Sequence, residues 1–419
     1  MTILIRDALL DNQVTSVLIE GGRIRSVGAT VTDTPVDRVL DGSGLHLFPS
    51  FRNSHTHVAM VLFRGYGDDM PLMEWLQTRI WPAEGKLDAD DVHAGARLGI
   101  LEMIRSGTTF FNEMYWHRGA LVRAVEEMGV RAMLGANLLD LGDPEALRRQ
   151  KEEILELVPA GEGEGRARLA LAPHSVYTVP PAELEWVGGL AHDHDLRIHI
   201  HLSETAGEVE RCVEEHGCRP AEHLDRLGLV GPHLIAAHGQ YLDEAEMELL
   251  AGKGATVVTN PLANLKLATG GIFPYAQAKR AGLRVCIGTD GAASNNNLDL
   301  IEEMKMAALL QKHREADATM LPADEVLSLA TTVPAELFGQ GTGRIEEGEP
   351  ADLILVDLSE ARTQPVHDPV SALVYAASGM QVRTTLCDGQ VLMHDGIIEI
   401  CDEEEVIRKA VEVARRVTV

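Results

Sequence analysis

Two histidines one residue apart, His55 and His57, are the first residues of this chain whose types and spacing could do chemistry. They follow an apolar segment, residues 45–51, and we expect residues 53–57 to form a β-strand. Successive side chains of a strand point to opposite faces, so the two imidazoles would share one face, about 7 Å apart. Both could then bind a single metal ion.

Later strand-like segments end in side chains of the same kind. A buried histidine or aspartate at the end of an apolar run is costly unless it has a partner, and a shared metal ion would satisfy several at once. Three histidines and a carboxylate suit Zn²⁺, with Fe²⁺ or Mn²⁺ as alternatives. Such an ion lowers the pKa of water to roughly 7 and so provides hydroxide at neutral pH. The residues at these strand ends are His174, His199, His201, His238 and Asp290.

The residue at the end of the fourth predicted barrel strand indicates how many metal ions the site holds. A two-metal site of this kind needs a bridging carboxylate, commonly a carbamylated lysine. The strand at residues 170–174 ends in His174 and offers no lysine. We therefore expect one divalent metal ion per subunit.

Three other histidines near the fifth strand have different expected roles. His192 and His194 are also one residue apart, but they lie in a polar stretch between a helix and a strand, so we place them on the surface. His199 shares a face with His201 but lies one layer deeper. We expect it in the core or in support of the ligands, not as a ligand.

Glu204 follows His201 by three residues and would emerge just beyond the end of the strand. A carboxyl group there can lean over the metal and carry protons during the reaction. The alternative is a carboxylate that only stabilises the start of a helix over residues 204–216. We favour the catalytic role.

Strands and helices alternate between residues 50 and 344, which indicates an α/β fold with eight β/α units. Polar residues recur at the carboxyl ends of the strands, which favours a (β/α)₈ TIM-type barrel over a doubly wound sheet. Both chain ends are rich in short strands, and we expect residues 1–49 and 345–419 to pair into one small β-sandwich with a terminal helix. The barrel domain would span 50–344. The expected strands end near His57, Asn112, Asn137, His174, Leu202, His238, Asn260 and Asp290.

Composition restricts the partners of the protein. The net charge of −27 argues against binding to nucleic acid or an anionic membrane surface. Residues 1–7 lack the features of a signal peptide, and no apolar run reaches membrane-spanning length, so we expect a cytoplasmic protein. The five cysteines are odd in number and none are spaced as Cys-x-x-Cys, which argues against a structural zinc cluster or disulfide framework. Cys286 is expected in the core.

Taken together, these residues resemble the mononuclear metal pattern of the amidohydrolase superfamily. The pattern consists of His55 and His57, a histidine on the fifth strand, His238 and Asp290. The segment 201–204, His-Leu-Ser-Glu, is similar to the His-x-x-Glu of the purine and nucleoside deaminase branch. The segment 343–353 is similar to the return into the small β-domain, so the resemblance covers essentially the whole chain.

Within that branch the sequence is most similar to 5'-methylthioadenosine/S-adenosylhomocysteine deaminases and 5'-deoxyadenosine deaminases. Segments 62–66, 75–76 and 81–84 match the long loop after the first barrel strand of this group. The resemblance implies that Glu84 binds the ribose hydroxyls and that His174 contacts the substrate. Without it, Glu84 would be interpreted as an ordinary carboxylate at the start of a helix.

The resemblance also implies the reaction, which is hydrolytic deamination of an adenine nucleoside to the inosine analogue and ammonia. Glu204 would protonate N1 of the ring, His238 would orient the attacking water, and Asp290 would accept a proton from it. Glu204 and Asp290 would thereby also contact the substrate. The implied metal ligands are His55, His57, His201 and Asp290.

Two departures from the pattern concern the first and third strands. The approach to His55 has Ser50 where the family has glycine, which leaves the ligands intact. Members that accept S-adenosylhomocysteine usually carry an arginine just after the third strand, whereas residues 134–138 contain none. This favours a compact 5'-substituent, as in 5'-deoxyadenosine or 5'-methylthioadenosine, although adenosine and S-adenosylhomocysteine stay among the candidates.

Two alternative functions stay open at this point. One is deamination or hydrolysis of guanine or a triazine-type ring on the same scaffold, for which Glu84 discriminates because a free base has no ribose. The other is a catalytically dead barrel that acts as an assembly protein, although such relatives typically lose metal ligands. By analogy with the family we expect a homo-oligomer that binds a small-molecule nucleoside.

Overall fold

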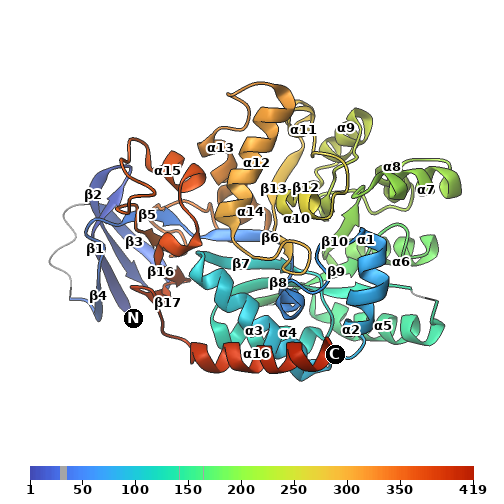
Figure 1. Cartoon of the computed structure of the whole chain (residues 1–419), viewed down its shortest axis with the longest axis horizontal. Coiled ribbons are helices and arrows are strands. Elements are labelled where there is room, and N and C mark those ends of the chain that lie inside the picture. The colour runs from blue at the N-terminus through green and yellow to red at the C-terminus, as the bar shows by residue number, and fades with distance from the viewer. Residues whose placement is uncertain (29–34, 141, 164) are drawn as a thin grey trace.

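Eight parallel strands form a closed barrel in the computed structural model, which describes residues 1–28, 35–140, 142–163 and 165–419 (Figure 1). Each strand pairs with the next in chain order, and a short ninth strand, β14 (Asp290–Gly291), pairs with β6 and closes the ring. The expected TIM-type barrel is therefore confirmed. The eight strands are β6 (Phe51–His57), β7 (Thr108–Glu113), β8 (Arg131–Leu138), β9 (Ala167–Pro173), β10 (Arg197–Leu202), β11 (Leu234–His238), β12 (Thr256–Thr259) and β13 (Arg284–Ile287).

The eighth strand differs from the prediction because it is interrupted before Asp290. β13 ends at Ile287, and Gly288 passes so close to β6 that an added Cβ would lie 2.7 Å from the backbone nitrogen and oxygen of His55. Only glycine fits this crossing. Asp290 then takes a left-handed conformation with φ of 60°. This brings the end of the strand directly against the His55 backbone.

Helices cover the outside of the barrel (Figure 1). The first of them, α3, begins after Asp88, whose side chain accepts hydrogen bonds from the backbone N–H groups of Asp90 and Asp91. None of the helices in the described part of the chain is long and apolar enough to cross a membrane. The barrel helices are α3 (Ala89–Arg105), α4 (Arg118–Met128), α5 (Pro144–Leu157), α6 (Pro181–His194), α7 (Ala206–His216), α8 (Pro220–Arg226), α9 (Glu244–Gly252), α10 (Pro261–Lys266), α11 (Tyr275–Ala281), α12 (Leu300–Glu315), α13 (Ala323–Ser328) and α14 (Thr332–Leu337), with a 3₁₀ turn η3 (Val158–Ala160).

Apolar side chains fill one end of the barrel interior. Phe110 on β7 and Phe338 after α14 pack with ring centroids 4.6 Å apart, and Cys286 is fully buried beside them, as expected. The polar residues follow the carboxyl ends of the parallel strands, and these ends form the opposite mouth of the barrel. The chemistry of the barrel is thereby restricted to one mouth.

The two chain ends meet in a separate nine-stranded sheet. Strand β5 from the N-terminal part pairs with β15 from the C-terminal part, and the sheet encloses its own apolar core. The buried carboxylate of Asp352 ties this sheet to the barrel, because it pairs with Arg52 and Arg131. The strands are β1 (Thr2–Leu10), β2 (Gln13–Glu20), β3 (Arg23–Gly28), β4 (Arg38–Asp41), β5 (His46–Pro49), β15 (Leu353–Val356), β16 (Val382–Cys387), β17 (Gln390–His394) and β18 (Ile397–Ile398).

Short helices fill the remaining connections. After β6 the chain forms η1 (Val58–Phe63), α1 (Leu72–Trp75), η2 (Leu76–Ile80) and α2 (Trp81–Glu84). Helix α15 (Pro369–Tyr375) and η4 (Gly379–Gln381) precede β16, and α16 (Glu403–Val417) packs along α3, where Arg105 Nε donates to Glu403 Oε1 over 2.6 Å.

Candidate metal centre and substrate pocket

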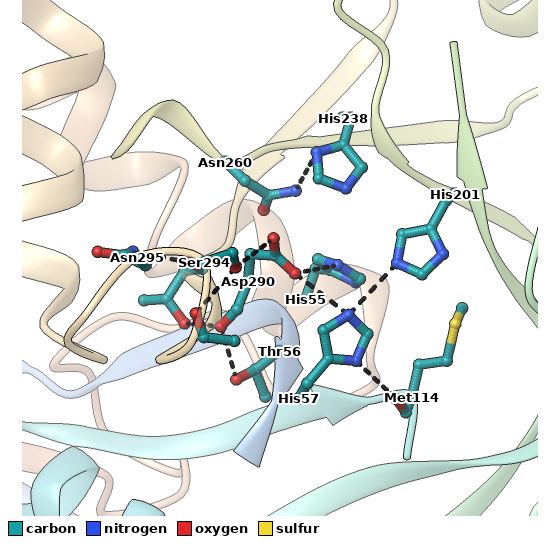
Figure 2. Close-up of polar contacts among 12 residues, drawn as sticks. His55, Thr56, His57, Met114, His201, His238, Asn260, Asp290, Ser294 and Asn295 are labelled. Carbon is teal, nitrogen blue, oxygen red and sulfur yellow. Dashed lines mark hydrogen bonds and ion pairs between the residues drawn. The ribbon is translucent and has the colours of Figure 1, made fainter. Parts of the chain in front are cut away.

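The four expected metal ligands, His55, His57, His201 and Asp290, meet at the mouth of the barrel (Figure 2). Asp290 Oδ1 lies 3.2 Å from His55 Nε2 and 3.1 Å from His57 Nε2. The Nε2 atoms of His57 and His201 are 3.3 Å apart. One atom from each of the four residues lies within 4.8 Å of the others, a group small enough to surround one cation. These atoms come from three elements, β6, β10 and β14.

The hydrogen bonds behind two of the histidines direct their lone pairs toward this centre. His57 Nδ1 lies 2.6 Å from the carbonyl oxygen of Met114, and His201 Nδ1 lies 2.9 Å from that of His174. A carbonyl can only accept, so each Nδ1 carries hydrogen, and in the neutral ring the lone pair of each Nε2 is available to a metal ion. Three imidazole nitrogens and one carboxylate oxygen are a donor set that fits Zn²⁺.

The charges of the site favour a cation at the same point. Burial lowers the pKa of His55 to about 4, and burial beside other histidines holds the pKa of His201 well below its ordinary value, so both rings are neutral. Burial opposes ionisation of Asp290, but its bonds to His55 and His57 outweigh this and hold its pKa well below the usual range. Burial likewise lowers the pKa of His57, whereas the bond to Asp290 raises it to about 9. The ionised carboxylate of Asp290 thus attracts a positive charge to the point where it meets Nε2 of His55 and of His57.

Ser294 holds the second oxygen of Asp290. Its hydroxyl donates to Asp290 Oδ2 over 2.7 Å, which leaves Oδ1 facing the histidines (Figure 2). Ser294 was not expected from the sequence. The only available signal was its position four residues after Asp290, in a loop whose conformation cannot be inferred from residue spacing.

His238 and Glu204 flank the four-residue group. His238 ends β11 with φ of 73°, and its Nε2 lies 4.0 Å from Glu204 Oε2. Its Nδ1 lies 2.9 Å from Asn264 Oδ1 and 3.3 Å from Asn260 Nδ2. Burial raises the pKa of Glu204, which favours the protonated acid that could donate to a substrate. Asn260 was expected at the end of a barrel strand, but a contact of either asparagine with His238 was not expected from the sequence.

Glu208, on the first turn of α7, determines where Glu204 points. Its two carboxylate oxygens accept the backbone N–H groups of Ser203 at 2.7 Å and Glu204 at 2.8 Å. Thr205 caps the helix by accepting from the N–H of Glu208. Glu204 therefore does not cap the helix, which disfavours the purely structural alternative. Glu208 was missed because a glutamate inside a helix has no distinguishing sequence signal.

The pH dependence of stability should change when Glu208 is replaced by glutamine. Burial raises the pKa of Glu208 to about 7 from an ordinary value of 4.5, so between these values the folded state binds a proton that the unfolded state has lost. This group should therefore lower the free energy of unfolding by about 2.5 kcal/mol as the pH rises from about 5 to 8. Denaturant unfolding at both pH values should give a smaller decrease for Glu208→Gln than for the wild type. Equal decreases would contradict the assignment.

A cavity of about 470 Å³ opens over the metal group and is large enough for a nucleoside. A largely apolar part of its wall comes from the loop after β6, with Trp75 and Trp81 among its side chains. No lysine or arginine lines it among the residues that the structure describes, and Asn137 occupies the end of β8. Of the expected site residues, the cavity is lined by His57, Glu84, His174, His201, Glu204, His238 and Asp290, with His55 behind them.

Glu84, at the end of α2, and His174, directly after β9, both line this cavity. Glu84 ends α2, and burial raises the pKa of its carboxyl group to about 7. Burial and the neighbouring histidines lower the pKa of His174 to about 3, so its ring is neutral, with Nδ1 2.9 Å from the Thr178 hydroxyl. His192 and His194 are exposed in the last turn of α6, as expected for surface histidines.

Comparison with known proteins places the chain among related enzymes. It is 49% identical over 380 residues to a 5'-deoxyadenosine deaminase of Methanoregula boonei, an alignment that covers 90% of this chain and 86% of the relative. It is 43% identical over 401 residues to 5-methylthioadenosine/S-adenosylhomocysteine deaminase 1 of Archaeoglobus fulgidus, covering 96% and 94%. The crystal structure of an adenosine deaminase from Xanthomonas campestris with bound zinc superposes with a TM-score of 0.94 at 38% identity, covering 99% of this chain and 98% of that one.

The family model that matches the chain covers the barrel and much of the second sheet. It is described as the amidohydrolase family and matches residues 46–392. This range includes all four residues of the metal group as well as Glu84, Glu204 and His238. The chain belongs to the amidohydrolase family.

Proposed function

We propose that this protein is a metal-dependent hydrolase that deaminates an adenine nucleoside to the inosine analogue and ammonia. The observation that carries the proposal is the position of Glu204, a buried acid with a raised pKa that faces the same cavity as the metal group. The names of the similar proteins, 5'-deoxyadenosine and 5-methylthioadenosine/S-adenosylhomocysteine deaminases, support it.

The metal group would hold one divalent ion through His55, His57, His201 and Asp290. Zn²⁺ is favoured by this donor set and by the zinc in the similar adenosine deaminase structure, with Fe²⁺ and Mn²⁺ as alternatives. The bound ion would lower the pKa of a water molecule to roughly 7, so that hydroxide is available at neutral pH.

The residues around this group supply the proton transfers. Glu204 donates a proton to N1 of the adenine ring while the oxygen of water bonds to C6. Asp290 takes a proton from that water, and His238, whose Nε2 faces Glu204, hydrogen-bonds to the attacking oxygen. Asp290 then passes its proton to the amine, the C6–N bond breaks, and the C6 hydroxyl returns a proton to Glu204, so that water and the nucleoside become ammonia and the inosine analogue.

The flanks of the cavity bind the sugar. Glu84 accepts hydrogen bonds from the ribose hydroxyls, and His174, which lines the same cavity, also contacts the nucleoside. Binding energy far from C6 thereby fixes the ring against Glu204. The apolar wall with Trp75 and Trp81 suits a compact 5'-group such as that of 5'-deoxyadenosine or 5'-methylthioadenosine.

Ammonia release from a substrate panel tests the proposal. Purified, zinc-loaded protein should act on 5'-deoxyadenosine and 5'-methylthioadenosine with the highest kcat/KM, on adenosine and S-adenosylhomocysteine less well, and on guanine or a chlorotriazine not measurably. Activity on guanine or a triazine alone would replace the proposal with the ring-hydrolase alternative. Failure to act on any of them, together with failure to bind a divalent ion, would favour a non-catalytic barrel.

Asn137→Arg should shift the preference toward S-adenosylhomocysteine. An arginine at this position would pair with the amino-acid carboxylate, and one such bond is worth about 1.5 kcal/mol, or roughly tenfold. The ratio of kcat/KM for S-adenosylhomocysteine to that for 5'-methylthioadenosine should rise by that factor. Asn137→Gln, which lengthens the side chain without adding charge, is the matched control and should leave the ratio unchanged.

The proposal also includes how the protein assembles and where in the cell it acts. We expect a cytoplasmic homo-oligomer, by analogy with the family. Sedimentation of the purified protein tests the oligomeric state directly, since a monomer at micromolar concentration would contradict it.

A further inference from the structure

His199 contacts the metal group from behind. It lies on β10 two residues before His201, so the two side chains point into the barrel from the same face of the strand. It is fully buried, and its Nε2 lies 2.8 Å from Nδ1 of His55. His199 is not part of the four-residue group, so its contact with that group runs through His55.

The hydrogen-bond partner of Nδ1 differs between His55 and the other two histidines of the group. His57 and His201 each face a backbone carbonyl oxygen, which can only accept a hydrogen bond. His55 faces an imidazole nitrogen, which can either donate or accept. The position of the proton on His55 therefore depends on the identity of the residue at position 199.

The geometry requires one arrangement of protons when His55 binds a metal through Nε2. Its Nδ1 must then carry hydrogen and donate to His199 Nε2, which accepts through its lone pair. The single proton of a neutral His199 ring must accordingly lie on its Nδ1. That atom is buried and makes no hydrogen bond of good geometry among the described residues, although the Glu113 backbone contacts the ring.

This arrangement costs the protein stability, because a buried N–H without a well-formed hydrogen bond is only partly compensated for the loss of water. The neighbouring interior of the barrel, with Phe110, Ile235 and Cys286, is filled by apolar side chains, so a hydrophobic residue at position 199 would avoid the cost. The hydrogen bond to His55 is the contact that a hydrophobic residue could not make.

We propose that His199 is a positioning residue that fixes the ring orientation and the proton of His55 and thereby raises the affinity of the site for its metal ion. The proposal rests on the metal site of the proposed function. Partners of this kind behind a metal-binding histidine typically contribute about 10–100-fold to metal affinity.

Zinc affinity of two variants tests this proposal. His199→Leu removes the acceptor, whereas His199→Gln can place an amide oxygen where Nε2 was. Titration of metal-free protein against a chromophoric chelator should show Zn²⁺ affinity lowered by about 10–100-fold in His199→Leu and largely restored in His199→Gln. His194→Leu, at an exposed histidine of α6, is the control and should bind zinc like the wild type.

The stability of the metal-free protein provides a second measurement. His199→Leu should unfold at an equal or higher denaturant concentration than the wild type, because it removes a buried N–H that has no well-formed hydrogen bond. If this variant does not fold, His199→Met, which is flexible enough to fill the same space, takes its place. A Zn²⁺ affinity equal to that of the wild type in the apolar variant, or equally reduced in His199→Gln, would overturn the proposal. Failure of the wild type itself to bind zinc would instead contradict the proposed function.

Discussion

Replacing Glu204 with glutamine should lower kcat for adenine nucleosides by about 10²–10⁴-fold, the usual contribution of a general acid. An amide cannot deliver the proton that N1 needs as oxygen bonds to C6. Metal content should be unchanged, because Glu204 is not among the four residues of the metal group. Ammonia release and elemental analysis on the same preparation check both parts of this prediction.

The matched control is Glu210→Gln, which changes an exposed glutamate of α7 and should leave kcat unaltered. The acid must be protonated to act, and burial raises the pKa of Glu204, so the wild-type rate should fall as the pH increases through that raised value. Near-normal turnover by Glu204→Gln would show that another group protonates the ring. Loss of the metal together with activity would assign Glu204 to the metal site instead.

The sequence was sufficient to predict the barrel and the metal group because both depend on local patterns. The two-residue period of a strand places His55 and His57 on one face, and parallel strands of a barrel bring their carboxyl ends to one mouth. His201 and Asp290 were therefore expected at the same place before their distances were known. The seven uninterrupted barrel strands end within one residue of the predicted positions.

The residues that support the site could not be predicted in this way. Ser294 reaches Asp290 only because Gly288 and the left-handed Asp290 redirect the chain after β13. Glu208 and Asn264 act through hydrogen bonds whose geometry depends on how a helix or a loop begins. No periodic pattern encodes such contacts, since each depends on the conformation of a single turn.

The role proposed for Glu84 was predicted only from the resemblance to a family. Without that resemblance, Glu84 would be interpreted as an ordinary carboxylate at the start of a helix. The structure places it on the wall of the cavity, where burial raises its pKa to about 7. The fold of the loop after β6, with its π-helical turn η2, brings it there, and this fold has no simple sequence signature.

Glu84→Gln should raise KM for adenine nucleosides by about 10–100-fold, because a hydrogen bond to a charged group contributes about 1.5–3 kcal/mol. The variant should keep most of its kcat at saturating substrate, since the ribose hydroxyls take no part in bond breaking. The wild-type KM should also rise as the pH falls below about 7, where the carboxyl group becomes protonated and can no longer accept from both hydroxyls. Steady-state kinetics from pH 5.5 to 8.5 measure both effects.

The control for this substitution is Glu74→Gln, at an exposed glutamate on α1 of the same loop. It should leave KM unchanged, which separates the loss of a substrate contact from a general disturbance of the loop. A 2',3'-dideoxy nucleoside provides the complementary comparison, because it lacks the hydroxyls that Glu84 would bind. Its KM should be the same for the wild type and for Glu84→Gln. An unchanged KM for ribonucleosides in Glu84→Gln would remove the argument for a nucleoside and favour a free base or triazine-type ring as the substrate of this cavity.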